Sequence, residues 1–160
     1  MDEAPGQTAS WSLAMTLAAI GAFLALIGVF LGWFGVTAVR QTAIFGREIV
    51  RSETRAGTQD ITGIVAAVLG WFIGVLAIAA LVAGTPVYRR FAASFAAFGG
   101  LALVATSGLG AARAATVAQG TGVVLGRMTL EGTTSLGLSV SAAGGAVAAL
   151  AGMIALRTRT

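Results

Sequence analysis

The chain alternates between long apolar runs and shorter stretches that carry its charges. Four runs contain no charged residue, and they cover residues 4–39, 61–88, 91–112 and 132–156. Each run exceeds the roughly 20 apolar residues that a helix needs to cross a bilayer. The pattern predicts four transmembrane helices at 12–39, 61–84, 91–115 and 134–156.

The connections between these helices differ in length and polarity. The second and third helices are joined by the tight segment GTPVYRR, whereas residues 40–60 and 116–133 form longer polar loops. We therefore expect residues 1–160 to form one all-α membrane domain, a four-helix bundle built as two hairpins. Both long loops then lie on one side of the membrane, and both termini lie on the other.

The two longer loops contain segments with the composition of strands. EIVRSET and GVVLGRMTLEG are rich in β-branched residues and are bounded by glycine, which favours a small β element above the bundle. Continuation of the first helix through Ala43 or Phe45 is the equally favoured alternative.

The first apolar run has the features of a retained membrane helix. Asp2 and Glu3 stand where a secretory signal peptide would carry basic residues, and the apolar stretch is longer than a signal's 7–15 residues. In a helix, Trp11 and Trp33 would be roughly 33 Å apart, close to one hydrocarbon thickness. Both are therefore predicted to be interfacial anchors.

A second group of interfacial anchors is predicted between the second and third helices. Tyr88, Arg89 and Arg90 follow one another there, and such aromatic and basic residues prefer the headgroup region.

Trp71 does not fit an interfacial belt, because it lies near the middle of the second predicted helix. Phe91, Phe95 and Phe98 are spaced to share one face of the third helix. Trp71, Phe95 and Phe98 are the candidate residues for an apolar pocket. Filling of space beside small residues, or contact with lipid, is the simpler interpretation.

Small residues recur at helical spacing in every predicted span. Such faces let helix backbones approach closely, which is how transmembrane helices associate. We expect them to hold the bundle together, with the alternative that one face binds another membrane subunit. The candidate packing residues are Gly28, Gly32, Gly70, Gly74, Ala96, Gly100, Ser141 and Gly145.

Composition and charge agree with a membrane location. Of the 160 residues 57% are hydrophobic and 10% are charged, which excludes an ordinary soluble fold. The net charge of +4 comes from arginines beside the spans, so membrane lipids are the expected partners and nucleic acid is not.

The residue inventory excludes several kinds of chemistry. The chain contains no Cys, His, Lys or Asn, which removes most nucleophiles, proton shuttles and soft metal ligands. None of the four uncharged runs places a charged residue inside the membrane, although ion-coupled carriers and pumps normally need an ionisable group there. We therefore expect no catalytic, cofactor-binding or metal-binding residues.

Charge alone does not decide the orientation of the bundle. The side of the termini has four arginines and two acids, and the side of the long loops has six arginines and four acids. Both sides sum to +2, so the positive-inside rule is balanced.

Four segments give the chain a resemblance to small prokaryotic four-helix membrane proteins, including the tryptophan-associated membrane proteins. They are LGWFG, TQDITG, GTPVYRR and TSLGLSVSAAGG. Such proteins are similar in layout to claudin-like tetraspans, although this chain lacks the disulfide-forming cysteines of true claudins. The resemblance implies a multi-pass protein of the cell membrane with cytoplasmic termini and two external loops, and it implies no activity.

These observations predict a non-catalytic accessory, scaffolding or assembly subunit of a larger membrane complex. Its expected partners are other membrane subunits or further copies of itself. The alternative is a small channel or transporter for lipid or another hydrophobic substrate, with a pocket near Trp71.

Overall fold

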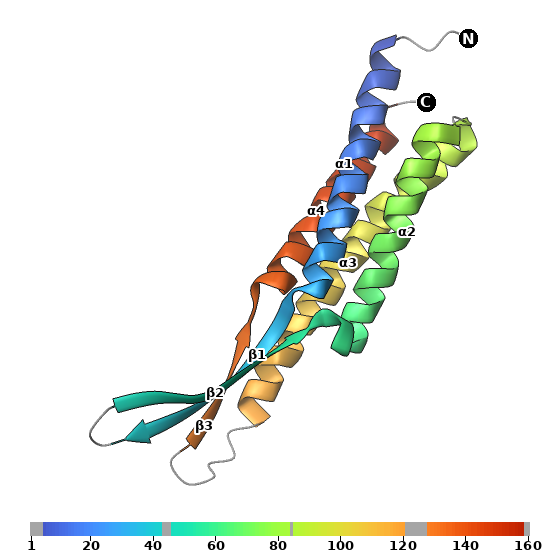
Figure 1. Cartoon of the computed structure of the whole chain (residues 1–160). Coiled ribbons are helices and arrows are strands. Elements are labelled where there is room, and N and C mark those ends of the chain that lie inside the picture. Colours follow the sequence, from blue (N-terminus) through green and yellow to red (C-terminus); the bar gives the residue numbers. More distant parts are fainter. Residues whose placement is uncertain (1–4, 43–45, 84, 121–127, 159–160) are drawn as a thin grey trace.

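The computed structural model describes residues 5–42, 46–83, 85–120 and 128–158. It contains four long helices, a three-stranded sheet and one short 3-10 turn (Figure 1). The helices are α1 (Pro5–Phe30), α2 (Ile61–Ala83), α3 (Pro86–Gly120) and α4 (Leu136–Arg157). The strands are β1 (Gly32–Thr42), β2 (Gly46–Ala56) and β3 (Met128–Thr134), and the 3-10 turn η1 covers Gly57–Gln59.

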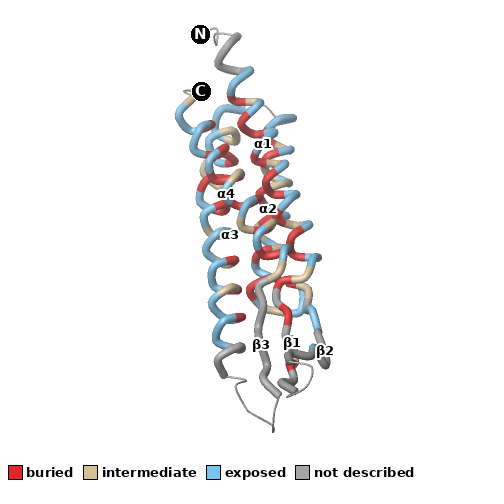
Figure 2. The backbone as a smooth tube through the Cα atoms, turned by 90° about the vertical axis from the view of Figure 1, so that its left-hand side faces the viewer, coloured by how far each residue is buried: buried red, intermediate tan, exposed pale blue. Residues whose placement is uncertain are grey.

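The four helices form one bundle and are long and apolar enough to cross a membrane. Each helix packs mainly against two neighbours, so that α1 and α3 lie diagonally opposite each other, as do α2 and α4. Buried residues line the inward sides of the helices, and exposed residues line the outward sides (Figure 2). The predicted four-helix transmembrane bundle is confirmed.

The first helix is shorter at its C-terminal end than the sequence indicates. It ends at Phe30, and the chain continues from Gly32 as strand β1, so the prediction of a helix over 12–39 is wrong beyond Phe30. An uninterrupted apolar run fits a strand as well as a helix, and the β-branched residues Val36, Thr37 and Val39 favour the strand. The helical continuation toward Ala43 is wrong for the same reason, whereas residues 43–45 lie outside the described ranges.

The expected β element is a single antiparallel sheet with the strand order β2-β1-β3. Val36 pairs with Glu53 of β2 on one side and with Gly132 of β3 on the other. EIVRSET lies within β2, and the end of GVVLGRMTLEG lies within β3, while residues 122–127 of that segment are outside the described part. The sheet extends from the end of the bundle opposite the termini (Figure 1).

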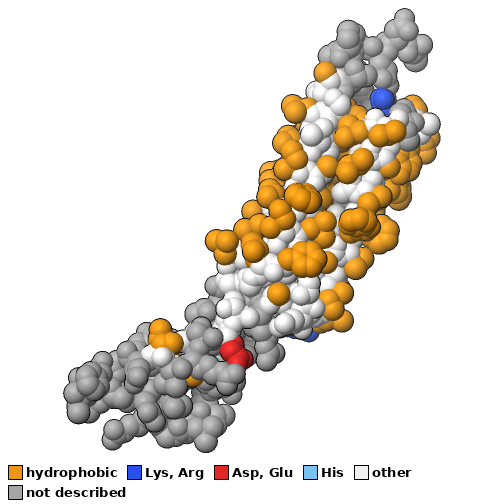
Figure 3. Space-filling model, in the orientation of Figure 1, with side chains coloured by type: hydrophobic (Ala, Val, Ile, Leu, Met, Phe, Trp, Pro, Cys, Tyr) orange, Lys and Arg blue, Asp and Glu red, His pale blue; other side chains and the backbone are white. Residues whose placement is uncertain are grey.

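Helix α3 is longer than its partners and joins the bundle to the sheet. Its 35 residues span about 52 Å, compared with about 35 Å for the 23 residues of α2. The last turns of α3 lie beside the strands (Figure 1), with more extensive contact to β3 than to β1. Apolar side chains cover the outer surface of the bundle, as expected for contact with lipid (Figure 3).

Candidate functional site

Glycines bring the backbones of α1 and α4 into close contact. A methyl group added at Gly28 would lie 2.5 Å from the backbone nitrogen of Ser141 and 2.6 Å from the carbonyl oxygen of Gly137. One added at Gly144 would lie equally close to the backbone of Gly21 and Ala25. The two backbones therefore touch along several turns, and a larger side chain would separate them.

The contact between α3 and α4 is built in the same way. A methyl group at Gly100 would lie 2.6 Å from the carbonyl oxygen of Gly145, and it would also meet the backbone nitrogen of Ala149. In return, a methyl group at Gly145 would lie 2.7 Å from the Cβ atom of Leu103. Ala96 of α3 is also buried and belongs to the hydrophobic core.

The remaining candidate packing residues make looser contacts within the chain. A methyl group at Gly70 would lie 3.3 Å from the carbonyl oxygen of Ala22, and one at Gly74 would be in ordinary contact with the same residue. Gly32 lies at the start of β1 and faces the side chains of Thr54 and Ser135. All eight candidates thus meet other parts of their own chain, so these positions are not free faces for a second protein.

Trp33 occupies the junction between the bundle and the sheet. Its side chain is 0% exposed, and its indole Nε1–H donates a hydrogen bond of 3.1 Å to the carbonyl oxygen of Gly28. Carbonyl groups in the last turn of a helix lack partners within the helix, so this bond satisfies one of them at the end of α1. The prediction that Trp33 is an interfacial anchor is wrong, because protein surrounds the ring.

Three parts of the chain close around this ring. The indole lies against Gly57 of η1 and against Gly110 of α3, where an added methyl group would approach it to 2.8 Å and 3.1 Å respectively. Leu138 of α4 contributes to the same cluster. The glycines at these two positions make room for the indole.

A polar cluster marks the start of α2 next to this junction. Asp60 accepts hydrogen bonds from the backbone nitrogen of Thr62 at 2.8 Å and from its hydroxyl group at 2.5 Å. Arg113 of α3 forms an ion pair with the same carboxylate oxygen at 3.3 Å. The hydrogen bond from the Thr62 hydroxyl lowers the pKa of Asp60, and the bond from the Thr62 N–H and the charge of Arg113 act in the same direction. Burial opposes these effects but does not outweigh them.

The opposite end of the bundle carries the other predicted anchors. The guanidinium carbon of Arg89 lies 4.8 Å from the centre of a Trp11 ring, within the range of a cation–π contact. Trp11 is 3% exposed, so its ring packs inside the protein and not against lipid. Tyr88 packs partly against the core, and Arg90 is exposed. For Tyr88, Arg89 and Arg90, interfacial anchoring remains a prediction.

Two of the three candidate pocket residues are largely exposed. Trp71 is 63% exposed and Phe98 is 72% exposed, and both lie on outward faces of their helices. Phe95 packs partly against the core and pairs with Phe91 at 6.2 Å between ring centres. A pocket formed by Trp71, Phe95 and Phe98 stays a prediction, because helical spacing places residues on a face without saying where that face points.

Sequence reasoning missed several residues that the packing depends on. Gly21, Gly144 and Gly152 each meet the backbone of a neighbouring helix. Their signal is present in the sequence, because Gly144 lies three residues after Ser141, and Gly21 and Gly152 lie seven residues, or two turns, from Gly28 and Gly145. The pairing of Asp60 with Arg113 spans 53 residues, and nothing in the spacing of single charges could have indicated it.

Comparison with models of known protein families gave no match, and comparison with curated proteins gave no significant similarity. The structure supports the four-helix layout that prompted the resemblance noted above. It provides no support for membership of the tryptophan-associated membrane proteins or of the claudin-like tetraspans.

Proposed function

We propose that this protein is a non-catalytic accessory or assembly subunit of a larger membrane protein complex. The observation that carries the proposal is the backbone-to-backbone packing of α4 against α1 and α3 at Gly28, Gly100 and Gly144. Helices in such contact leave no space between them for a solute path. The surfaces that remain for function are the outward faces of the helices and the sheet.

The chemistry of the chain supports the same proposal. No group of three or more His, Cys, Asp or Glu side chains that suits a metal ion occurs in the described part of the chain. Residues 61–83 of α2 and 136–156 of α4 contain no charged side chain, and the charges of α3 lie near its ends. The alternative, a transporter with a pocket near Trp71, has no observation in its favour because Trp71 faces outward.

Crosslinking in the native membrane, followed by purification in mild detergent, tests the proposal. We expect the protein to appear in a reproducible complex with at least one other integral membrane protein. A protein that is recovered as a monomer without partners after effective crosslinking would contradict it.

We further propose that the termini are cytoplasmic and that the sheet lies outside the cell membrane. Arg89 and Arg90 follow a two-residue connection between α2 and α3, and Arg157 is in the last turn of α4. Arginines beside short connections weigh most in the positive-inside rule. Their guanidinium groups would contact anionic lipid headgroups on that side.

A further inference from the structure

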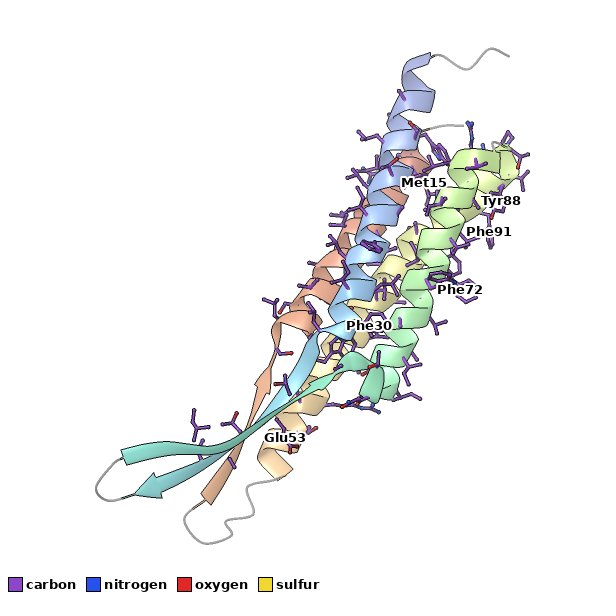
Figure 4. The ribbon with its side chains drawn as sticks, viewed as in Figure 1. Met15, Phe30, Glu53, Phe72, Tyr88 and Phe91 are labelled. Atoms are coloured by element: carbon purple, nitrogen blue, oxygen red, sulfur yellow. The ribbon has the colours of Figure 1, made fainter. Side chains whose placement is uncertain are left out.

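Two serine hydroxyl groups lie inside the bundle without a hydrogen-bond partner. Ser107 of α3 and Ser141 of α4 are both 0% exposed, and neither Oγ atom has a partner in the described part of the chain. The bundle turns apolar side chains such as Phe72 and Phe91 outward (Figure 4), whereas these two polar groups are inside. A buried hydroxyl group without a hydrogen bond is unfavourable, so a partner for each is expected.

The contacts between α3 and α4 place these two serines opposite each other. A methyl group added at Gly145 of α4 would lie 2.7 Å from the Cβ atom of Leu103 of α3. The two helices run in opposite directions (Figure 1). Ser141 is one turn before Gly145, and Ser107 is one turn after Leu103. The two serines therefore lie in the same layer of the bundle, on faces that meet.

The other helices contribute small side chains to this layer. Ser141 lies against Gly28 of α1, where an added methyl group would approach its Cα atom to 2.9 Å. Ala66 is the fully buried residue of α2 two turns before Ile73, which meets α3. Neither glycine nor alanine has a side-chain donor or acceptor. Only a molecule as small as water fits a closed layer of this kind.

Other hydroxyl groups in the helices bond to their own backbone. Thr106 donates to the carbonyl oxygen of Leu103 at 3.0 Å, and further serines and threonines of α1 and α3 do the same. This is a common arrangement inside helices. Ser107 is next to Thr106 but does not adopt it, and neither does Ser141. Since the two serines also form no bond with each other, a bridging molecule is the arrangement that satisfies both.

We infer that Ser107 and Ser141 hold one buried water molecule between α3 and α4. Water can donate to one hydroxyl group and accept from the other, and buried waters typically bond to polar groups that otherwise have no partner. A single enclosed water joins the two helices and provides no path for a solute. The inference does not depend on the proposed function, because it concerns the interior of the bundle and not its surface.

A double-mutant cycle in the full-length chain tests whether the two hydroxyl groups act together. Ser107→Ala, Ser141→Ala and the double variant are unfolded under identical detergent conditions. We expect each single substitution to raise the equilibrium constant for unfolding about threefold, the average effect of an interhelical hydrogen bond in a membrane. The double substitution should add little to either single one, because loss of one hydroxyl group already releases the water.

Thr106→Val is the matched control. It removes a hydroxyl group that bonds to its own helix and keeps the shape of the side chain, so its effect should simply add to that of Ser141→Ala. A crystal structure that resolves ordered water then identifies the bridge. We expect an oxygen atom at about 2.5–3.0 Å from the Oγ atoms of both Ser107 and Ser141.

Each other outcome overturns the inference. Single substitutions that leave stability unchanged or raise it, with additive effects, would show that the two hydroxyl groups act independently. Coupling between Ser107 and Ser141 without an ordered water between them would assign the coupling to a direct bond between the serines. Equal coupling of Thr106 with Ser141 would assign it to a general effect of substitutions in α3.

Discussion

Two residues at the sheet end of the bundle show how single polar groups fix this structure. The Trp33 indole bonds to the last turn of α1, and Asp60 holds the first turn of α2 through Thr62. Asp60 occupies the N-cap position, because its carbonyl oxygen also accepts the hydrogen bond of Ile64. Both residues therefore stabilise a helix end next to the boundary of the membrane.

Replacing Trp33 by Phe should destabilise the protein. The change leaves the carbonyl oxygen of Gly28 without its donor inside a closed cluster, for which about 1–3 kcal/mol is typical. The free energy of unfolding in detergent measures the effect. Trp71→Phe is the matched control, since that N–H has no partner among the described residues, and an equal loss in both variants would contradict this role of Trp33.

Asp60 should make stability depend on pH in the acidic range. Its folded-state pKa is lowered, so the carboxylate adds to the free energy of unfolding when it is ionised. This stabilisation is complete above the ordinary pKa of about 3.9 and is lost as the pH falls through the lower folded-state pKa. Asp60→Ala should cost about 1 kcal/mol near neutral pH through loss of the cap. Unfolding measured between neutral and acidic pH reports both effects.

Asp60→Asn separates the charge from the cap. An asparagine side chain can still accept the bond from the Thr62 nitrogen, so most of the capping should remain. The acid-induced loss of stability below about pH 4 should become smaller, because the titrating group is gone. The same acid dependence in this variant would assign the effect to another carboxylate.

At the scale of helices and strands, glycine sets how closely the elements approach. Gly100 and Gly108 lie on the same helix, yet an added methyl group would meet the backbone of α4 at Gly100 and nothing within 4 Å at Gly108. Spacing alone assigns both to a small-residue pattern. Only the neighbouring helix distinguishes a contact from an exposed position.

Gly100→Ala should therefore destabilise the bundle by about 1–3 kcal/mol, because α3 and α4 must move apart. Gly108→Ala should leave stability unchanged or raise it slightly, since alanine favours the helix and meets no obstacle. Unfolding of the two variants under identical detergent conditions compares them. Equal losses would show that the backbone contact at Gly100 is not tight.

At the scale of the whole molecule, the four spans separate two different ends. The termini and the connection between α2 and α3 lie at one end, and the sheet lies at the other (Figure 1). Described acidic and basic residues mix at the sheet end, whereas Arg89, Arg90 and Arg157 are the charged residues described at the other end. A bundle of this kind must expose these ends on opposite sides of the membrane.

Single cysteines can test this arrangement, because the chain has none of its own. Glu53→Cys lies in the sheet and Thr85→Cys in the connection between α2 and α3, and both side chains are exposed. An impermeant maleimide applied to intact cells should label Glu53→Cys and should label Thr85→Cys only after permeabilisation. Reversed labelling would reject the orientation, and labelling of both from one side would reject the four-span arrangement.

The sequence by itself determined the four spans, the two hairpins and the presence of β structure in the long loops. Apolar length and the position of charges suffice for these features, because the bilayer imposes them on any chain. The sequence does not determine where α1 ends, because the apolar run through Trp33 and Val39 suits a helix and a strand equally well. Only pairing with β2 and β3 decides for the strand.

The tertiary structure also decided the roles of the aromatic residues. Trp33 is buried, although its position in the sequence predicts an interfacial anchor, and Trp71 faces outward, although its place within the span suggests a pocket. A helix repeats its faces every few residues, so the sequence gives the relative direction of side chains and not which face meets the other helices. The face that meets the other helices is the one where two backbones can touch. In this protein the glycines of α1, α3 and α4 determine that face.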